Sequence, residues 1–252
     1  MTTSFDCALN GVLLSSLDER ICVLDVLERA PKVQQTALTL YPEGRQQLLS
    51  RRESLTAEVI FAIHEEDPVR RASVMRQVRA WANTGGILTV ADRPGLQLTV
   101  ICTGLPAMTS DSWTEKCALT FQTTRCPYWE DAQVTSASGT GPLTITLPGT
   151  AESAPVNANI RNTSDETITS ITLRAGSTQM TFRDIQFPAG RLLIFNQTGG
   201  PLLAEIDGES ILRCRTADSD DQLLLPCGRE STIYATADHA VSAGFSARGR
   251  YV

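Results

Sequence analysis

Apolar and polar residues alternate along several short segments in the first half of the chain, a pattern typical of half-buried β-strands. The clearest run lies between residues 54 and 64, where apolar side chains occupy every second position: Leu55, Ala57, Val59, Phe61 and Ile63. Because side chains alternate across a strand, this run predicts a strand with one buried face. Similar runs predict further strands over residues 5–15, 20–28, 86–92, 96–104 and 113–124.

One segment of this half has helical spacing instead. Asp67 is a natural N-cap, and Pro68 suits the first helical position, where its missing N–H costs nothing. Apolar residues then recur at helical intervals up to the Gly85-Gly86 step, which ends the helix: Val69, Ala72, Met75, Val78, Trp81 and Ala82. The opposite face carries four arginines, which are interpreted either as a solvated face or as a contact with an acidic neighbour: Arg70, Arg71, Arg76 and Arg79.

Residues 41–54 are polar and rich in arginine, and they predict a long connecting loop. Loops of this length are commonly mobile or used for contacts. Arg45, Arg51 and Arg52 are therefore candidate interface residues.

The second half, from residue 132 onward, has no helical pattern longer than one turn. Short β-rich runs alternate there with turn signals rich in Gly, Pro, Asn and Ser, which favours an antiparallel sandwich or jelly roll. We therefore predict a mainly β protein with two domains. Residues 1–131 form an α+β domain, a β-sandwich-like sheet with one helix, and residues 132–252 form an all-β sandwich.

The predicted junction contains the sequence Cys126-Pro127-Tyr128-Trp129. Proline ends a strand because it lacks a donor N–H. Tyr128 and Trp129 then either pack within the chain where the domains join, or serve as anchors for a partner subunit.

Composition excludes several functional classes. The 252 residues are 42% hydrophobic, which is ordinary for a globular protein, and the net charge of −6 gives no basic surface for nucleic acid. The N-terminal residues lack the features of a signal peptide, and no long apolar run predicts a membrane span. The seven cysteines contain no Cys-x-x-Cys pair, so we expect reduced, mostly buried thiols in a protein made in the cytoplasm: Cys7, Cys22, Cys102, Cys117, Cys126, Cys214 and Cys227.

The search for catalytic chemistry finds no strong signal. His64 and His239 lie apart from any candidate nucleophile, and neither a Gly-x-Ser-x-Gly motif nor a nucleotide-binding loop is present. Cys214, Cys227 and His239 are too widely spaced for a structural zinc site. An acidic run is better interpreted as a hairpin turn than as a calcium site, which needs six to eight oxygens: Asp218, Asp220 and Asp221. We therefore predict no catalytic residue, cofactor or metal.

Four segments together resemble the distal tail protein family of long-tailed phages, within the wider group of siphovirus-type tail components. Residues 5–31 resemble its first hairpin, and residues 43–104 resemble its central strand–helix–strand unit with the Asp-Arg-Pro-Gly turn. Residues 113–132 resemble the strand that ends the first domain in Pro-Tyr-Trp, and the terminal Phe-Ser-Ala-Arg-Gly-Arg-Tyr-Val resembles the final strand of many members.

This resemblance implies structural work at the tip of a phage tail. Members form hexameric rings through an N-terminal belt domain, and a galectin-like sandwich follows it. The ring joins the tail tube protein to the tail hub and, in many phages, to receptor-binding proteins. The expected partners are thus other copies of the chain and these tail proteins, after assembly in the host cytoplasm. The candidate ring contacts are Arg45, Arg51, Arg52, Arg70, Arg71, Arg76, Arg79, Tyr128 and Trp129.

Two other functions stay open. The second domain could be a lectin-like module that binds carbohydrate in host adhesion, although its tyrosines are few and it has no tryptophan for a sugar platform. A cell-wall hydrolase would need a pocket with a perturbed carboxylate or histidine, and the sequence singles out none.

Overall fold

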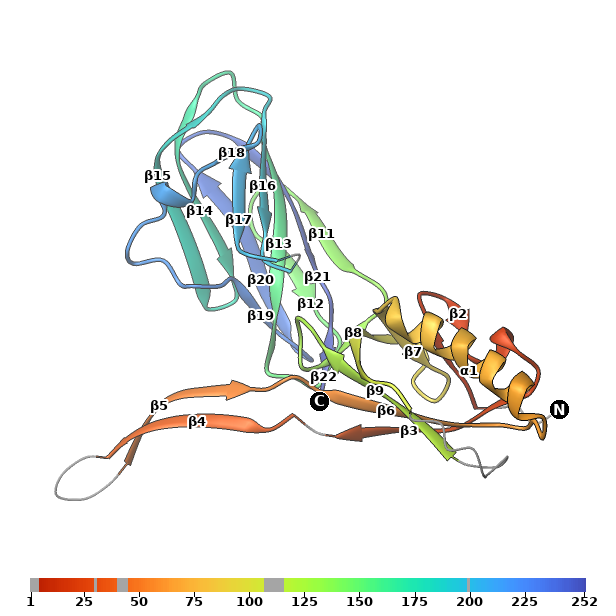
Figure 1. Ribbon diagram of the computed structural model, residues 1–252. Helices are drawn as coiled ribbons and strands as arrows, with labels where there is room; N and C mark the ends of the chain where they lie inside the picture. The colour runs from red at the N-terminus through yellow and green to blue at the C-terminus, as the bar shows by residue number, and fades with distance from the viewer. Residues whose placement is uncertain (1–4, 30, 40–44, 107–115, 199) are drawn as a thin grey trace. The chain divides into compact units, whose positions relative to one another are not determined.

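The computed structural model describes residues 5–29, 31–39, 45–106, 116–198 and 200–252, and for residues 33–39 and 45–51 it describes the backbone (Figure 1). The chain forms two compact units, Met1–Trp129 and Glu130–Val252. The sequence predicted the boundary between the two domains after residue 131. The described residues form antiparallel sheets and a single α-helix, so the predicted mainly β fold class is confirmed.

The first unit contains one antiparallel sheet with the strand order β2-β1-β7-β8-β9-β6-β3. Its strands are β1 (Cys7–Leu9), β2 (Val12–Leu13), β3 (Ile21–Arg29), β6 (Thr56–Ile63), β7 (Gly86–Val90), β8 (Leu96–Gly104) and β9 (Lys116–Thr123). The alternation predicted for β6 is confirmed, because all five apolar residues of that run, starting with Leu55 just before the strand, are buried.

Helix α1 (Pro68–Asn83) packs its apolar side against this sheet. Its buried side chains include Val74, Met75 and Val78, and the ring of Trp81 meets Phe121 of β9 edge-on with 6.0 Å between the ring centroids. Val69 was predicted on the buried face, and this was wrong: its side chain is 74% exposed. Val69 lies in the first turn of α1, where its backbone N–H donates to the side chain of Asp67.

The Gly85-Gly86 step after α1 is required by a close approach. Gly86 has φ +122°, and a Cβ there would lie 2.1 Å from Oδ1 of Asn10. Asn10 in turn donates from Nδ2 to the Gly85 carbonyl at 2.7 Å and accepts from the Ile87 N–H at 2.9 Å. The β1–β2 turn is thereby fastened to the start of β7.

Residues 41–54 were predicted to form a loop, and for residues 45–52 this was wrong. These residues form β5 (Arg45–Arg52), which pairs antiparallel with β4 (Val33–Thr39). We call this two-stranded hairpin the arm. It continues the pairing of β3 with β6, since β4 follows β3 and β5 leads into β6 (Figure 1). The polar sequence hid β5, because residues Arg45–Arg52 do not alternate apolar and polar side chains.

The second unit is a sandwich of two antiparallel sheets around one apolar core. One sheet has the order β11-β21-β13-β16-β17-β18, with β19 beside β13, and the other has the order β12-β20-β14-β15. The strands of these two sheets are β11 (Thr135–Gly139), β12 (Leu143–Thr146), β13 (Ser153–Asn162), β14 (Ile168–Ala175), β15 (Thr178–Phe187), β16 (Leu192–Asn196), β17 (Leu203–Ile206), β18 (Glu209–Ser210), β19 (Leu224–Pro226), β20 (Glu230–Ala237) and β21 (Val241–Ala247). The short strand β22 (Arg250–Tyr251) lies outside both sheets and pairs with β10 (Trp129–Asp131).

The sequence missed β11, whose residues Thr-Ser-Ala-Ser-Gly carry no apolar alternation. It forms because its backbone pairs with β21 over its whole length. Aromatic side chains from both sheets fill the core between them, including Phe182 and Phe187 of β15, Phe195 of β16 and Phe245 of β21.

Candidate functional site

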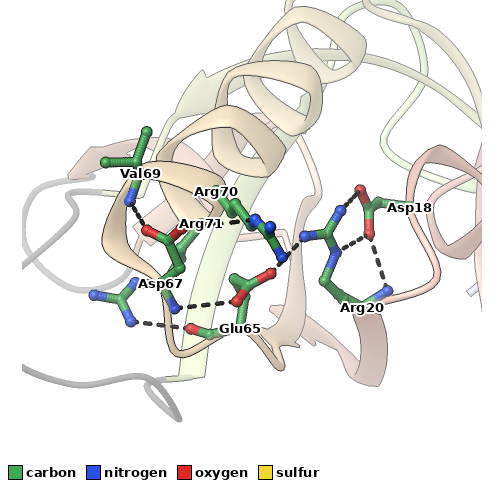
Figure 2. A network of polar contacts seen from close by, with 7 residues as sticks. All are labelled: Asp18, Arg20, Glu65, Asp67, Val69, Arg70 and Arg71. Atoms are coloured by element: carbon green, nitrogen blue, oxygen red, sulfur yellow. Dashed lines mark hydrogen bonds and ion pairs between the residues drawn. The ribbon is translucent and has the colours of Figure 1, made fainter.

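A polar network joins the N-terminal end of α1 to the sheet (Figure 2). Asp67 accepts the backbone N–H of Val69 at 2.8 Å, as predicted for an N-cap. Glu65 accepts the Asp67 N–H at 3.0 Å and forms an ion pair with Arg20 at 2.5 Å. Arg20 also donates from Nε and Nη2 to the two carboxylate oxygens of Asp18, at 2.7 and 2.9 Å. The start of β3, the end of β6 and the helix are thus held together by one guanidinium.

This network makes the first unit sensitive to acid. Hydrogen bonds from Arg20 hold the pKa values of Asp18 and Glu65 below their ordinary 3.8 and 4.5. A carboxyl group with a lowered pKa in the folded state stabilises the fold above its ordinary pKa, and that contribution is lost as the pH falls through the folded-state value. We expect Arg20→Gln to destabilise the protein at neutral pH, with a difference from wild type that shrinks below pH 4.

Urea denaturation at neutral and acidic pH measures this effect. Arg76→Gln is the matched control, because Arg76 is an exposed arginine of α1 and is not among the groups that lower the pKa of Asp18 or Glu65. A stability difference for Arg20→Gln that stayed constant with pH would contradict the assigned role of the two carboxylates.

The four arginines of α1 do not form one solvated face. Arg70 and Arg76 are exposed, but Arg71 is buried and donates to the Glu65 carbonyl at 3.1 Å. Arg79 is partly buried and donates to the Pro106 carbonyl at 2.7 Å. The interpretation of Arg71 as a surface group was therefore wrong, because its side chain is buried and its guanidinium donates to a backbone carbonyl.

A hollow of about 400 Å³ lies where the arm leaves the sheet. We call it the arm-root hollow. It is lined by Arg52, Glu53, Ser54, Gln122, Thr123, Thr124, Arg125, Cys126 and Pro127. The guanidinium of Arg52 lies over the ring of Tyr128, 5.2 Å from its centroid, so a cation–π contact orients it. Arg45 and Arg51 belong to β5 by their backbone, and their side chains lie outside the described residues.

Trp129 is buried and forms a compact cluster with two charged residues of the first unit. Its Nε1 donates to Oε2 of Glu28 at 2.9 Å, and the Arg93 guanidinium lies over its ring, 4.7 Å from the centroid. Arg93 and Glu28 form an ion pair at 2.5 Å. Trp129 is only 2% exposed, which favours the first of its two interpretations, packing within the chain. The sequence could not indicate this cluster, because its members come from three distant segments.

The residues considered for chemistry are dispersed. His64 and His239 are both exposed, and no group of His, Cys, Asp or Glu side chains in the described residues could hold a metal ion. The acidic run instead covers the edge of β15. Asp220 accepts the Gln179 N–H at 2.7 Å, and Ser219 accepts the Thr181 N–H at 2.9 Å. These side chains accept hydrogen bonds from backbone N–H groups of β15, which would otherwise be unpaired at the edge of the sheet.

None of the seven cysteines, all of which lie among the described residues, forms a disulfide bond. The expectation that most are buried was wrong: Cys7 and Cys126 are buried, Cys22 is exposed and the others are intermediate. Burial, with the charge of Asp6 beside it, raises the pKa of Cys7 to about 12, so this thiol is inert. Among the described residues, no helix has the length and apolarity needed to cross a membrane.

This chain matches known proteins in its three-dimensional structure rather than in its sequence. No protein-family model matches the sequence, and no curated protein matches it. The crystal structure of the SPP1 Dit (gp 19.1) protein, described as a paradigm of the hub adsorption apparatus in phages infecting Gram-positive bacteria, superposes with a TM-score of 0.66. The alignment has 14% identity and covers 97% of this chain and 98% of that chain.

Two structures of the phage p2 baseplate in its activated conformation, with Sr and with Ca, give a TM-score of 0.46. Their identity is 8% and the alignments cover 97% of each chain, a level at which superposition does not establish a shared fold. The SPP1 likeness, by contrast, spans nearly the whole chain. The protein thus has the fold of SPP1 Dit, in agreement with the resemblance of its sequence to phage distal tail proteins.

Proposed function

We propose that this chain is a structural protein of a phage tail tip and a member of the distal tail family. In this proposal it assembles as a hexameric ring that connects the tail tube protein to the tail hub and to receptor-binding proteins. The first unit acts as the belt that closes the ring, and the second unit is a galectin-like sandwich. The protein works without catalysis, cofactor or metal, in a virion assembled in the host cytoplasm.

The arm is the observation that carries this proposal. An isolated two-stranded hairpin is only marginally stable in water, because its strands leave backbone donors and acceptors unpaired along both edges. Within the part of the chain that is described, β4 and β5 pair only with each other. A second copy of the chain is the partner that a ring provides.

Ring closure also requires two different surfaces on each subunit that fit one another. The arm and the arm-root hollow give one such surface, with Arg52 oriented by Tyr128. Exposed Arg70 and Arg76 on α1 are further candidates, whereas buried Arg71 and Trp129 are withdrawn from the set. A chain with a net charge of −6 supplies acidic groups that these arginines can meet.

Solution mass and negative-stain images of the purified protein test the proposal. We expect rings with six times the 27.3 kDa mass of one chain. Gln35 and Ser50 are registered partners in the arm, so an Asn-Gly turn can replace residues 36–49 and close a shorter hairpin. This variant should remain a monomer, because it lacks most of the arm.

Tryptophan fluorescence and circular dichroism serve as the control that the shortened variant still folds. A wild-type chain that stayed monomeric at every concentration would contradict ring formation by the chain alone. Rings formed equally well by the shortened variant would contradict the role of the arm. Binding of uncharged glycans by a monomer would favour the lectin-like function instead.

A further inference from the structure

The second unit contains a hollow of its own. It has a volume of about 430 Å³ and is lined by Arg183, Asp184, Arg213, Cys214, Arg215 and Thr216. We call it the arginine hollow. Arg183 and Asp184 belong to β15, and the other four residues belong to or follow the short 3₁₀ helix Leu212–Cys214.

An irregularity in β15 shapes this hollow. Ile168 of β14 pairs with Phe187 but Ser170 pairs with Arg183, so extra residues of β15 bulge out between these two pairs. Asp184 lies in this bulge with a left-handed φ of +56°, which is unusual for a residue other than glycine. A bridge between Phe182 and Arg215 holds the facing segment in place. Such bulges redirect side chains and are frequent beside binding sites.

The arginines of the hollow are only partly neutralised. Arg183 and Arg213 are exposed and form no salt bridge among the described residues, although Asp218 lies near enough for the charge of Arg183 to lower its pKa. Arg215 pairs at 2.8 Å with Asp221, whose side chain is 95% exposed and therefore free to move away. Three arginines thus line one hollow in a protein whose overall charge is negative.

The carboxylates of Asp218 and Asp220, close to the hollow in sequence, already accept hydrogen bonds within the protein. Asp220 is bound to the Gln179 N–H on the edge of β15. A hydrogen bond from Thr216, together with the charge of Arg183, lowers the pKa of Asp218 and keeps it ionised. Asp184 is the one carboxylate that lines the hollow. Its oxygens accept hydrogen bonds, so it suits a ligand that carries hydroxyl groups beside its negative charge.

We propose that the arginine hollow binds a hydroxylated ligand that carries an oxyanion, either a sugar phosphate or a sugar acid. The planar fork of a guanidinium matches the oxygens of phosphate and carboxylate, and such charge-assisted pairs are stronger than neutral hydrogen bonds. Arg183 and Arg213 bind the oxyanion, and Asp184 accepts from the ligand hydroxyls. This activity is independent of ring closure, because it belongs to the second unit.

Isothermal titration of the full chain with three probes tests this proposal: glucose 1-phosphate, glucuronate and glucose. We expect one or both anions to bind and glucose to bind far more weakly, and the tighter of the two anions identifies the source of the oxyanion. High salt should weaken the binding. Failure of both anions to bind, or binding of glucose with equal affinity, would overturn the proposal.

A pair of charge-matched variants locates the site. Arg183→Gln with Arg213→Gln should weaken anion binding by at least about tenfold, since two charge-assisted hydrogen-bonding groups are lost. Arg161→Gln with Arg229→Gln removes the same charge from exposed positions of the same unit outside the hollow and should leave the affinity unchanged. An equal loss in both double variants would show attraction to overall charge alone, and this would contradict a built site. Both variants alter exposed residues, and circular dichroism checks their folding.

Discussion

Replacement of Phe121 by alanine is expected to lower the free energy of unfolding of the first unit by about 3–5 kcal/mol. Phe121 is fully buried on β9, where it lies opposite Ala57 of β6 and Cys102 of β8. Its ring also meets Trp81 of α1 edge-on, so it joins the helix to the sheet. Alanine loses the apolar contacts and leaves a cavity that the surrounding strands cannot close.

Urea denaturation followed by tryptophan fluorescence isolates this effect, because all three tryptophans precede residue 130 in the sequence. Phe121→Leu is the control: it keeps most of the side-chain volume and should cost clearly less than alanine. A loss below about 1 kcal/mol for Phe121→Ala would mean that the core collapses onto the vacated space, contrary to its tight packing.

Replacement of Trp129 by alanine is expected to destabilise the first unit by a similar amount, about 3–5 kcal/mol. Three interactions are lost at once: the packing of the buried indole, its hydrogen bond to Glu28, and the cation–π contact with Arg93. Glu28 and Arg93 would keep their ion pair but lose the ring that shields it from water.

Trp129→Phe separates these contributions. Phenylalanine keeps an aromatic face for Arg93 but has no N–H for Glu28, so the loss should be about 1.5–3 kcal/mol, the usual value for a hydrogen bond to a charged group. Fluorescence of Trp81, which both variants retain, follows unfolding in urea. Equal stability of Trp129→Phe and wild type would show that the indole N–H contributes nothing to the fold.

The candidate interface was only partly accessible to sequence reasoning. The arginine content of residues 41–54 made this segment a candidate interface, but it could not reveal that residues 45–52 form a strand of the arm. Helical spacing located the arginines of α1 without showing which are buried. The burial of Arg71 could not be predicted, because it depends on the segment after β6, where the Glu65 carbonyl accepts a hydrogen bond from the Arg71 guanidinium.

The sequence by itself determined the local elements. The alternation along β6, the Asp67-Pro68 start of α1 and the turn at Asp92-Arg93-Pro94-Gly95 each depend on residues within a few positions of one another. Such preferences act through backbone geometry, short-range hydrogen bonds and the period of apolar side chains, so they can be recognised without the fold.

The strands and side-chain contacts that need a partner far away in the sequence form only in the tertiary structure. Strands β5 and β11 lack an apolar pattern and exist because β4 and β21 satisfy their backbone groups. The indole of Trp129 binds Glu28, a residue 101 positions earlier in the chain. Hydrogen bonds and ion pairs of this kind form only after long-range strand pairing has brought the groups together, and no local preference encodes them.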